Sequence, residues 1–205
     1  GGQGLRQLEV NSSKHVSWSA VRALMIGMPQ LRVVGMRDVH STMDGNARCI
    51  EVADNSELAS LDLSFNKLLQ HWRQNVVLEG LVRLDVSYCS LPRVALIMVL
   101  EATPALEALE ARGEFAVSDS LVDDLSDVWQ SSRLRYVDVS GRGGRITVRG
   151  LVAWLEQLAQ IKVLDVRGHA KLMRHDEMAD ALREEFPQVV VRLGGSGERK
   201  HLSSC

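Results

Sequence analysis

The chain has 205 residues, of which 45% are hydrophobic, 24% charged and 4% aromatic, and its formal net charge is −2. This composition is typical of a globular protein with enough apolar material for a sizeable, mainly aliphatic core. It lacks the basic surplus of a nucleic-acid-binding protein, and no apolar run approaches the roughly 18 residues that span a membrane. The three cysteines, Cys49, Cys89 and Cys205, are too widely spaced for a disulfide framework or a CxxC zinc site, which favours a reducing, cytoplasmic setting.

A short apolar pattern recurs along almost the whole chain. Its two clearest copies are LASLDLSFNKL, which begins at Leu58, and LVRLDVSYCSL, which begins at Leu81. Weaker copies in the same frame begin at Leu5, Leu31, Leu106, Leu134, Ile161 and Val189. The first positions lie 26, 27, 23, 25, 28, 27 and 28 residues apart. Leu or Val at alternate positions predicts a short strand with one buried face in each copy.

Between these strands the apolar spacing becomes helical. The predicted helical segments are 17–25, 94–100 with Pro92 in the first turn, 121–129 with Ser118 or Asp119 as N-cap, 151–158, and 178–182. Segment 41–57 is more polar and is the weakest helical candidate. The four tryptophans, Trp18, Trp72, Trp129 and Trp154, fall in helical segments at spacings that favour core packing.

The pattern LxxLxLxxNxL resembles that of the leucine-rich-repeat family. The resemblance implies an α/β solenoid of about seven or eight repeats, curved, with a parallel sheet on the concave side and helices on the convex side. Spacings of 26 to 28 residues with full helices are similar to the ribonuclease-inhibitor-like branch of that family. We expect the repeat domain to occupy residues 1–193 of a longer protein, because no cap precedes Leu5, and residues 194–205 to form a polar tail or linker.

The residue that follows each strand and turn has a structural role in this pattern. Asn66 is expected to bond backbone groups through its side-chain amide. Cys89 stands at the same place in its copy, where a small buried turn residue is expected and a reactive thiol is the alternative. His169 also falls at this place.

Motifs for chemistry are weak. The run 141–145, GRGGR, meets neither GxGxxG nor the Walker spacing, so a tight turn is expected there. His169 and His175 lie near Asp176 and Glu177, but their spacing does not converge on a metal. We therefore expect no enzyme, no cofactor, no metal site and no small-molecule substrate.

The family resemblance implies a protein-protein interaction module that binds its partner on the concave face and contacts neither nucleic acid nor membrane. Two alternatives remain open. The domain could recognise substrates for a larger ubiquitin-ligase-type protein, or it could be an architectural subunit of a large assembly. No F-box or RING-type Cys/His array is present in these residues.

The repeat frame predicts that two sets of residues pack together. One continuous core is predicted from Leu61, Leu63, Leu84, Val86, Leu109, Val137, Val139, Leu164 and Val166. Phe65 and Tyr88 occupy equivalent positions after neighbouring strands, so their rings are expected to stack and to anchor a partner. The alternative is that Phe65 folds over the repeat edge as additional core.

The position between the two central apolar residues of each strand points away from the core. It holds Glu9, Gly35, Asp62, Asp85, Glu110, Asp138 and Asp165. Arginines stand nearby at Arg37, Arg83, Arg112, Arg135 and Arg167, and Tyr136 lies on the same surface. We expect this acidic column to dock a basic or mixed-charge protein segment. The alternative is that the aspartates are simply tolerated there by the repeat.

Overall fold

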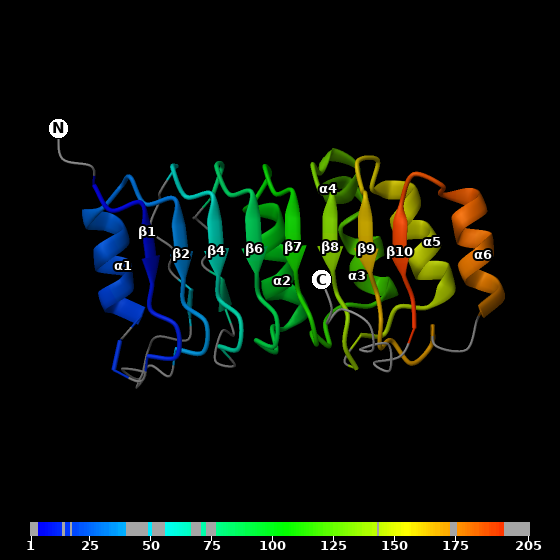
Figure 1. Ribbon diagram of the computed structural model, residues 1–205, viewed down its shortest axis with the longest axis horizontal. Coiled ribbons are helices and arrows are strands. Elements are labelled where there is room, and N and C mark those ends of the chain that lie inside the picture. Colours follow the sequence, from blue (N-terminus) through cyan, green and yellow to red (C-terminus); the bar gives the residue numbers. More distant parts are fainter. Residues whose placement is uncertain are drawn as a thin grey trace, which may run out of the picture.

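The computed structural model describes residues 4–13, 15–16, 18–39, 49–50, 56–66, 71–72, 77–142, 144–172 and 176–194. Its main feature is one open sheet of eight parallel strands, which pair in chain order (Figure 1). These strands are β1 (Gln7–Glu9), β2 (Val33–Gly35), β4 (Ser60–Asp62), β6 (Arg83–Asp85), β7 (Ala108–Glu110), β8 (Tyr136–Asp138), β9 (Val163–Asp165) and β10 (Val190–Arg192). Because each strand adds beside the previous one, the chain forms an α/β solenoid-like fold, as expected.

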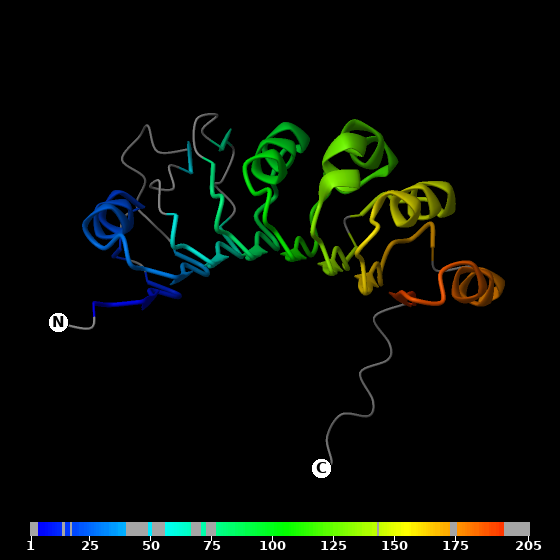
Figure 2. The same cartoon turned by 90° about the horizontal axis from the view of Figure 1, so that it is seen from above.

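The helices lie on one side of this sheet. They are α1 (Trp18–Gly27), α2 (Arg93–Glu101), α3 (Asp119–Asp124), α4 (Ser126–Ser131), α5 (Val148–Gln157) and α6 (Asp176–Glu185). Seen along the strands, the described helices follow the outer side of a shallow arc and the sheet lines the inner side (Figure 2). The expected concave sheet and convex helices are therefore present.

Two local predictions differ from the structure. The helix expected over 121–129 is broken, because Leu125 leaves helical geometry with φ −107° and ψ 19° and separates α3 from α4. Most of segment 41–57 lies outside the described residues. Its described residues 49–50 form strand β3 (Cys49–Ile50), which pairs with β5 (His71–Trp72) in a small second sheet. Trp72 is therefore in a strand rather than in the predicted helix.

Several expectations fall on parts of the chain that are not described. The core packing expected of the Trp18 and Trp72 side chains is outside the described side chains, as is the surrounding of Cys49. His175 and the segment 195–205, which includes Cys205, are also outside the described residues. Trp129 and Trp154 are buried, with ring centroids 5.3 Å apart, as predicted.

The predicted core is confirmed. All nine of its residues are buried in a single apolar cluster. The strand register places equivalent positions side by side, so that Leu61, Leu84, Leu109, Val137 and Leu164 form one row across five strands. Val191 is the last member of this row and pairs with Leu164. The repeat that begins at Val189 predicts this strand one residue later in the sequence than the structure places it.

At the carboxyl edge of the sheet, side chains of several strand units bond to the backbone of the preceding unit. The Asn66 amide donates to the backbone oxygens of Met36 and Leu63, each at 2.7 Å, as expected for this position. The Cys89 thiol donates to the Leu63 oxygen at 3.1 Å, and the buried Nε2 of His169 lies 2.8 Å from the Val139 oxygen. These contacts satisfy backbone groups that the turns would otherwise leave buried and unpaired.

The convex side has a comparable link between neighbouring units. Thr147 is the N-cap of α5, and its hydroxyl accepts a bond from the Gly150 amide. The Asp119 carboxylate in α3 in turn accepts bonds from the Thr147 amide and hydroxyl at 2.8 and 2.6 Å. Asp119 therefore stabilises the start of the next helix, whereas Ser118, the N-cap of its own helix, makes no side-chain cap bond.

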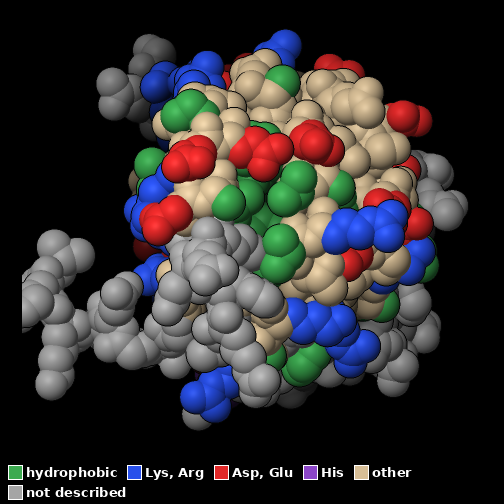
Figure 3. All heavy atoms as spheres, turned by 90° about the vertical axis from the view of Figure 1, so that its right-hand side faces the viewer, with side chains coloured by type: hydrophobic (Ala, Val, Ile, Leu, Met, Phe, Trp, Pro, Cys, Tyr) green, Lys and Arg blue, Asp and Glu red, His purple; other side chains and the backbone are tan. Residues whose placement is uncertain are grey.

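The end of the solenoid that carries β10 and α6 leaves hydrophobic side chains visible between acidic and basic ones (Figure 3). Strand β10 pairs with β9 on one side, and Val190 is exposed.

Among the described residues, no helix is both long and apolar enough to cross a lipid bilayer.

Candidate functional site: the concave sheet face

The concave face is built from two rows of side chains that alternate with the buried core positions. The first row, here called the acidic row, is Glu9, Gly35, Asp62, Asp85, Glu110, Asp138, Asp165 and Arg192, aligned by the strand register. The second, two residues earlier on each strand, includes Arg83, Ala108, Tyr136, Val163 and Val190 in consecutive strands. The predicted alignment of the acidic residues is confirmed.

All four aspartates of the acidic row have a local role in their own strand. Each accepts a hydrogen bond from the amide two residues later, at 2.9 Å for Asp62, 2.8 Å for Asp85, 3.0 Å for Asp138 and 3.2 Å for Asp165. This contact satisfies an amide just beyond the strand. Asp suits the position because its short side chain reaches back to that amide.

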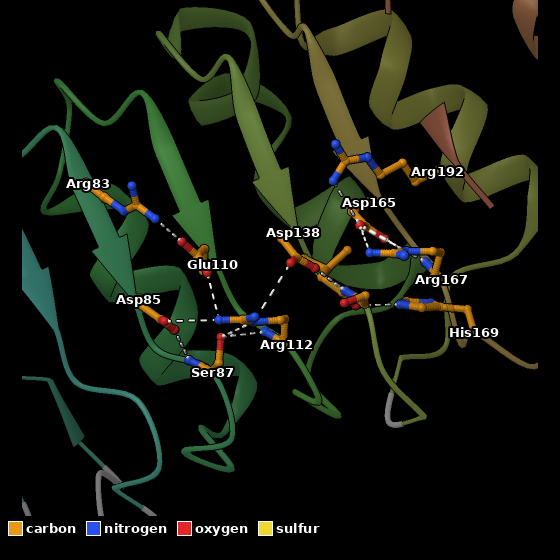
Figure 4. Close-up of polar contacts among 12 residues, drawn as sticks. Arg83, Asp85, Ser87, Glu110, Arg112, Asp138, Asp165, Arg167, His169 and Arg192 are labelled. Carbon is orange, nitrogen blue, oxygen red and sulfur yellow. Dashed lines mark hydrogen bonds and ion pairs between the residues drawn. The ribbon is translucent and has the colours of Figure 1, made fainter. Parts of the chain in front are cut away.

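The Glu110 side chain is too long for the same contact, so the amide two residues later finds another acceptor. The Arg112 amide donates instead to the Ser87 hydroxyl of the preceding unit at 3.1 Å. The Arg112 guanidinium lies across three carboxylates, at 2.8 Å from Glu110, 3.4 Å from Asp85 and 3.8 Å from Asp138 (Figure 4). Arg83 contacts Glu110 from the other side at 2.5 Å. One arginine thus holds together the carboxylates of three neighbouring strands.

Electrostatics in this cluster follow from the same contacts. Burial raises the pKa of Asp85, bonds from Ser87 lower it, and the neighbouring carboxylates of Asp62 and Glu110 raise it further. Burial lowers the pKa of Arg112, but the carboxylates around it outweigh this effect and raise the pKa overall. Arg112 therefore stays charged and is the counter-ion that makes the close approach of these acids tolerable.

Asp165 has its own pair of arginines. Its fully buried carboxylate accepts bonds from Arg167 Nε at 2.9 Å and Nη2 at 2.7 Å, and Arg192 Nη1 lies 3.6 Å away (Figure 4). The side-chain bond to Asp165 raises the pKa of Arg167. A two-point contact of this kind fixes the guanidinium in one orientation on the sheet face.

These contacts correct the expectation of an exposed acidic column. The side chains of Asp85, Glu110, Asp138 and Asp165 are only 0–14% exposed, whereas those of Arg83, Arg112, Arg167 and Arg192 are 37–60% exposed. The long arginine side chains lie over the shorter acids because this brings the opposite charges together while the guanidinium keeps contact with water. The sequence placed the residues correctly but not their order of depth.

The other predicted residues of this surface lie outside the arginine network. Asp62 is half-buried and, among the described residues, bonds only to the Ser64 amide. Arg135 lies 4.0 Å from Glu107 before strand β8. Tyr136 is half-buried, and burial together with the charge of Asp138 raises its pKa.

The predicted stack of Phe65 on Tyr88 is confirmed, with ring centroids 4.7 Å apart and an interplanar angle of 29°. Arg37 was expected near the acids but lies over the outer face of Phe65, 4.7 Å from its centroid. A Cβ on Gly113 would come within 2.6 Å of the Tyr88 ring, so the backbone of Gly113 covers the outer face of that ring. Both rings are exposed, Phe65 to 37% and Tyr88 to 40%.

The same two residues have a strained backbone. Phe65 and Tyr88 have φ angles of 63° and 58°, in the left-handed region that large side chains avoid. The equivalent positions of the other strand units hold Ser12, Asp38, Gly113, Gly141 and Gly168, which are small or short polar residues, all with positive φ. Two aromatics at these positions are therefore an exception to the local rule.

The two side chains that the sequence offered for chemistry, Cys89 and His169, both bond to backbone groups of the repeat. Burial raises the pKa of the Cys89 thiol to about 12, so the thiol is protonated and the reactive alternative is disfavoured. Burial lowers the pKa of His169, whose Nδ1 is buried without a partner. In the described part of the chain, no three His, Cys, Asp or Glu side chains are grouped so as to hold a metal ion.

Sequence reasoning missed two polar residues. Arg192 completes the acidic row, and the shift of one residue in its strand unit hid it. Glu114 stands at the position of Asn66, and its buried carboxylate accepts bonds from the amides of Cys89, Ser90 and Leu91 at 2.7, 2.9 and 2.6 Å. Its place in the repeat frame was the available signal.

A comparison of the chain with protein-family models and with curated protein sequences finds no match.

Proposed function

We propose that this chain is a leucine-rich-repeat solenoid of the ribonuclease-inhibitor-like kind, and that it binds a protein partner on its concave face. The repeat pattern and its spacing support the family assignment. The observation that carries the function is the concave face of a parallel sheet, on which no described helix lies. Such sheets occur almost always with helices on both faces, whereas all the described helices lie on the convex side here (Figure 2).

The side chains on that face support binding rather than catalysis. Its guanidinium groups are held in place by buried carboxylates, and Tyr136 and Val190 offer apolar surface beside them. Ordered arginines and aromatics are the residues that most often dominate protein interfaces. Neither Cys89 nor His169, which are both buried and bonded to backbone, is available as a catalytic group. Substrate recognition for a ligase and a role in a large assembly are both compatible with this proposal.

The test uses a steric block on the concave face. Ala108 lies between Arg83 and Tyr136 in the second row, so Ala108→Trp places a large ring on that face without entering the core. The matched control is Val94→Trp, at an exposed position of α2 on the convex side. Partners captured from native extract and identified by mass spectrometry should be lost with Ala108→Trp and kept with Val94→Trp. Equal capture by both variants and the wild type would refute binding on the concave face.

A further inference from the structure

We infer that the segment bound on the concave face is acidic, with Asp or Glu side chains beside apolar ones. This inference rests on the proposed function and adds the chemistry of the partner. It reverses the partner that the sequence alone suggests, because Asp85, Glu110, Asp138 and Asp165 lie beneath more exposed arginines in the structure.

The first argument is depth. The carboxylates of Asp85, Glu110, Asp138 and Asp165 are at most 14% exposed, and the arginines above them are at least 37% exposed. An approaching side chain therefore meets guanidinium before carboxylate. A lysine or arginine from a partner would have to displace an existing ion pair to reach an acid, whereas a carboxylate can add to the outer side of each arginine.

The second argument is unused bonding capacity. A guanidinium has five N–H donors. Arg112 uses Nε and Nη2 in its contacts, and Arg167 uses Nε and Nη2 on Asp165. Within the described part of the chain, the Nη1 groups of both residues remain as donors, and Arg83 contacts its acid through Nη2 alone. Because the inner acids fix each guanidinium, an incoming carboxylate loses little additional entropy in meeting it.

The third argument is the apolar stripe beside the arginines, which we define as Ala108, Tyr136, Val163 and Val190. These residues are cross-strand neighbours, two positions before the acidic row on the same sheet face. Four strands about 4.8 Å apart give a stripe about 14 Å long. A helix laid along it presents one residue per turn of 5.4 Å, so nearly one apolar side chain meets each strand.

The stripe and the inner acids favour a protein over a nucleic acid. The arginines Arg83, Arg112, Arg167 and Arg192 are matched by four acids that are at most 14% exposed, so their long-range field is largely cancelled and the attraction acts at contact distance. Nucleic-acid binding depends on a net positive surface. A sugar-phosphate backbone also has nothing to place on Val163 and Val190.

The experiment compares three synthetic 14-residue amphipathic peptides with identical leucine positions and with Glu, Gln or Lys at the flanking positions. Binding is measured by fluorescence anisotropy and mapped by ¹H–¹⁵N NMR on the full chain. The Glu peptide should bind about tenfold more tightly than the Gln peptide, with the Lys peptide weakest. The amides of β6 to β10 should shift, and the preference for Glu should decrease with added salt.

The variant pair Arg83→Gln and Arg192→Gln, made together, should reduce the preference for Glu, which Arg112 and Arg167 alone then support. Folding should be retained because Glu110 keeps Arg112 and Asp165 keeps Arg167. The control double variant, Arg93→Gln with Arg183→Gln, makes the same charge change at exposed positions on α2 and α6. It should leave the preference intact, and circular dichroism verifies that both variants are folded.

Each other outcome overturns the inference. If the Lys or Gln peptide binds the concave amides as tightly as the Glu peptide, the acidic partner is wrong while concave-face binding stands. Tighter binding of a single-stranded oligonucleotide than of the Glu peptide would identify the arginines as a nucleic-acid site. If none of the peptides shifts the concave amides, the inference fails, and the steric-block experiment then decides separately whether the proposed function fails with it.

Discussion

Arg112 is the residue on which the concave face depends most, and Arg112→Met is the most direct perturbation of it. The methionine keeps much of the aliphatic length and removes the charge. It leaves the carboxylates of Glu110, Asp85 and Asp138, which lie 2.8, 3.4 and 3.8 Å from the guanidinium, without their shared counter-ion. Glu110 alone keeps another arginine, Arg83.

The expected size of the effect follows from depth. Removing one partner of a fully buried ion pair costs about 3–5 kcal/mol. The three acids are nearly buried, but Arg112 is 37% exposed and solvent already screens its contacts. We therefore expect the free energy of unfolding to fall by about 2–3 kcal/mol at pH 7. Urea unfolding followed through the fluorescence of buried Trp129 and Trp154 measures it.

Two further measurements, the pH dependence of stability and a second substitution, distinguish the loss of charge from the loss of packing in Arg112→Met. Burial raises the pKa of Asp85, so acid neutralises this carboxylate and removes its need for a counter-ion, and the deficit of Arg112→Met should shrink at low pH. Adding Glu110→Gln should recover part of the loss at pH 7, because one of the repelling charges is removed. A loss below about 0.5 kcal/mol, or a loss that is the same at pH 3.5 and pH 7, would refute the account of the network.

Four other predictions follow from single side chains. Leu84→Ala should lower the free energy of unfolding by roughly 2–5 kcal/mol, and a loss under about 0.5 kcal/mol would contradict its place in the core. Tyr88→Gly should be more stable than Tyr88→Ala by about 1 kcal/mol, because glycine relieves the positive φ; the reverse order would show no strain. Glu114→Ala should cost about 3 kcal/mol or more in urea unfolding, since three turn amides lose their acceptor; a cost under about 1 kcal/mol would mean that water replaces the carboxylate. Burial lowers the pKa of His169, so the unfolded chain takes up its proton first and stability should fall, by up to about 1.4 kcal/mol per pH unit, as pH drops below about 6.5; His169→Asn should flatten this slope.

The strand frame could be predicted from the sequence because each strand unit repeats the same apolar spacing. Leu61, Leu84 and Leu109 are predicted and observed in one buried row, since alternation in a strand leaves little freedom of orientation. The same frame aligned Asp85 with its acidic neighbours. Where the repeat shortens by one residue, as before β10, the frame failed and Arg192 was missed.

The ends of the helices and the depth of side chains on the concave face were harder to predict from the sequence. The break at Leu125 depends on how α3 and α4 pack against α5, which one segment of sequence does not encode. Depth on the concave face depends on which long side chain lies over which short one. Arg37 and Arg112 occupy equivalent positions in their strands, but Arg37 lies over Phe65 and Arg112 lies over three carboxylates. Gly35 explains part of the difference, because it removes the acid from the strand that bears Arg37.

The concave face therefore combines two requirements that the sequence shows separately. An Asp after the central strand residue serves the local amide, and repeating that solution in adjacent strands brings like charges to about 4.8 Å spacing. The repulsion between these carboxylates is offset by arginines. Because an arginine side chain reaches the acids from above, the outer edge of its guanidinium group faces solvent. Positive charge on the binding surface is thus a consequence of acidic residues in the strands. If this reasoning holds, replacing Asp138 by Asn should loosen Arg112 as well as remove a charge, and the Glu peptide should bind that variant more weakly although the surface has become more positive. Tighter binding would show that net charge, not the orientation of the guanidinium, controls recognition.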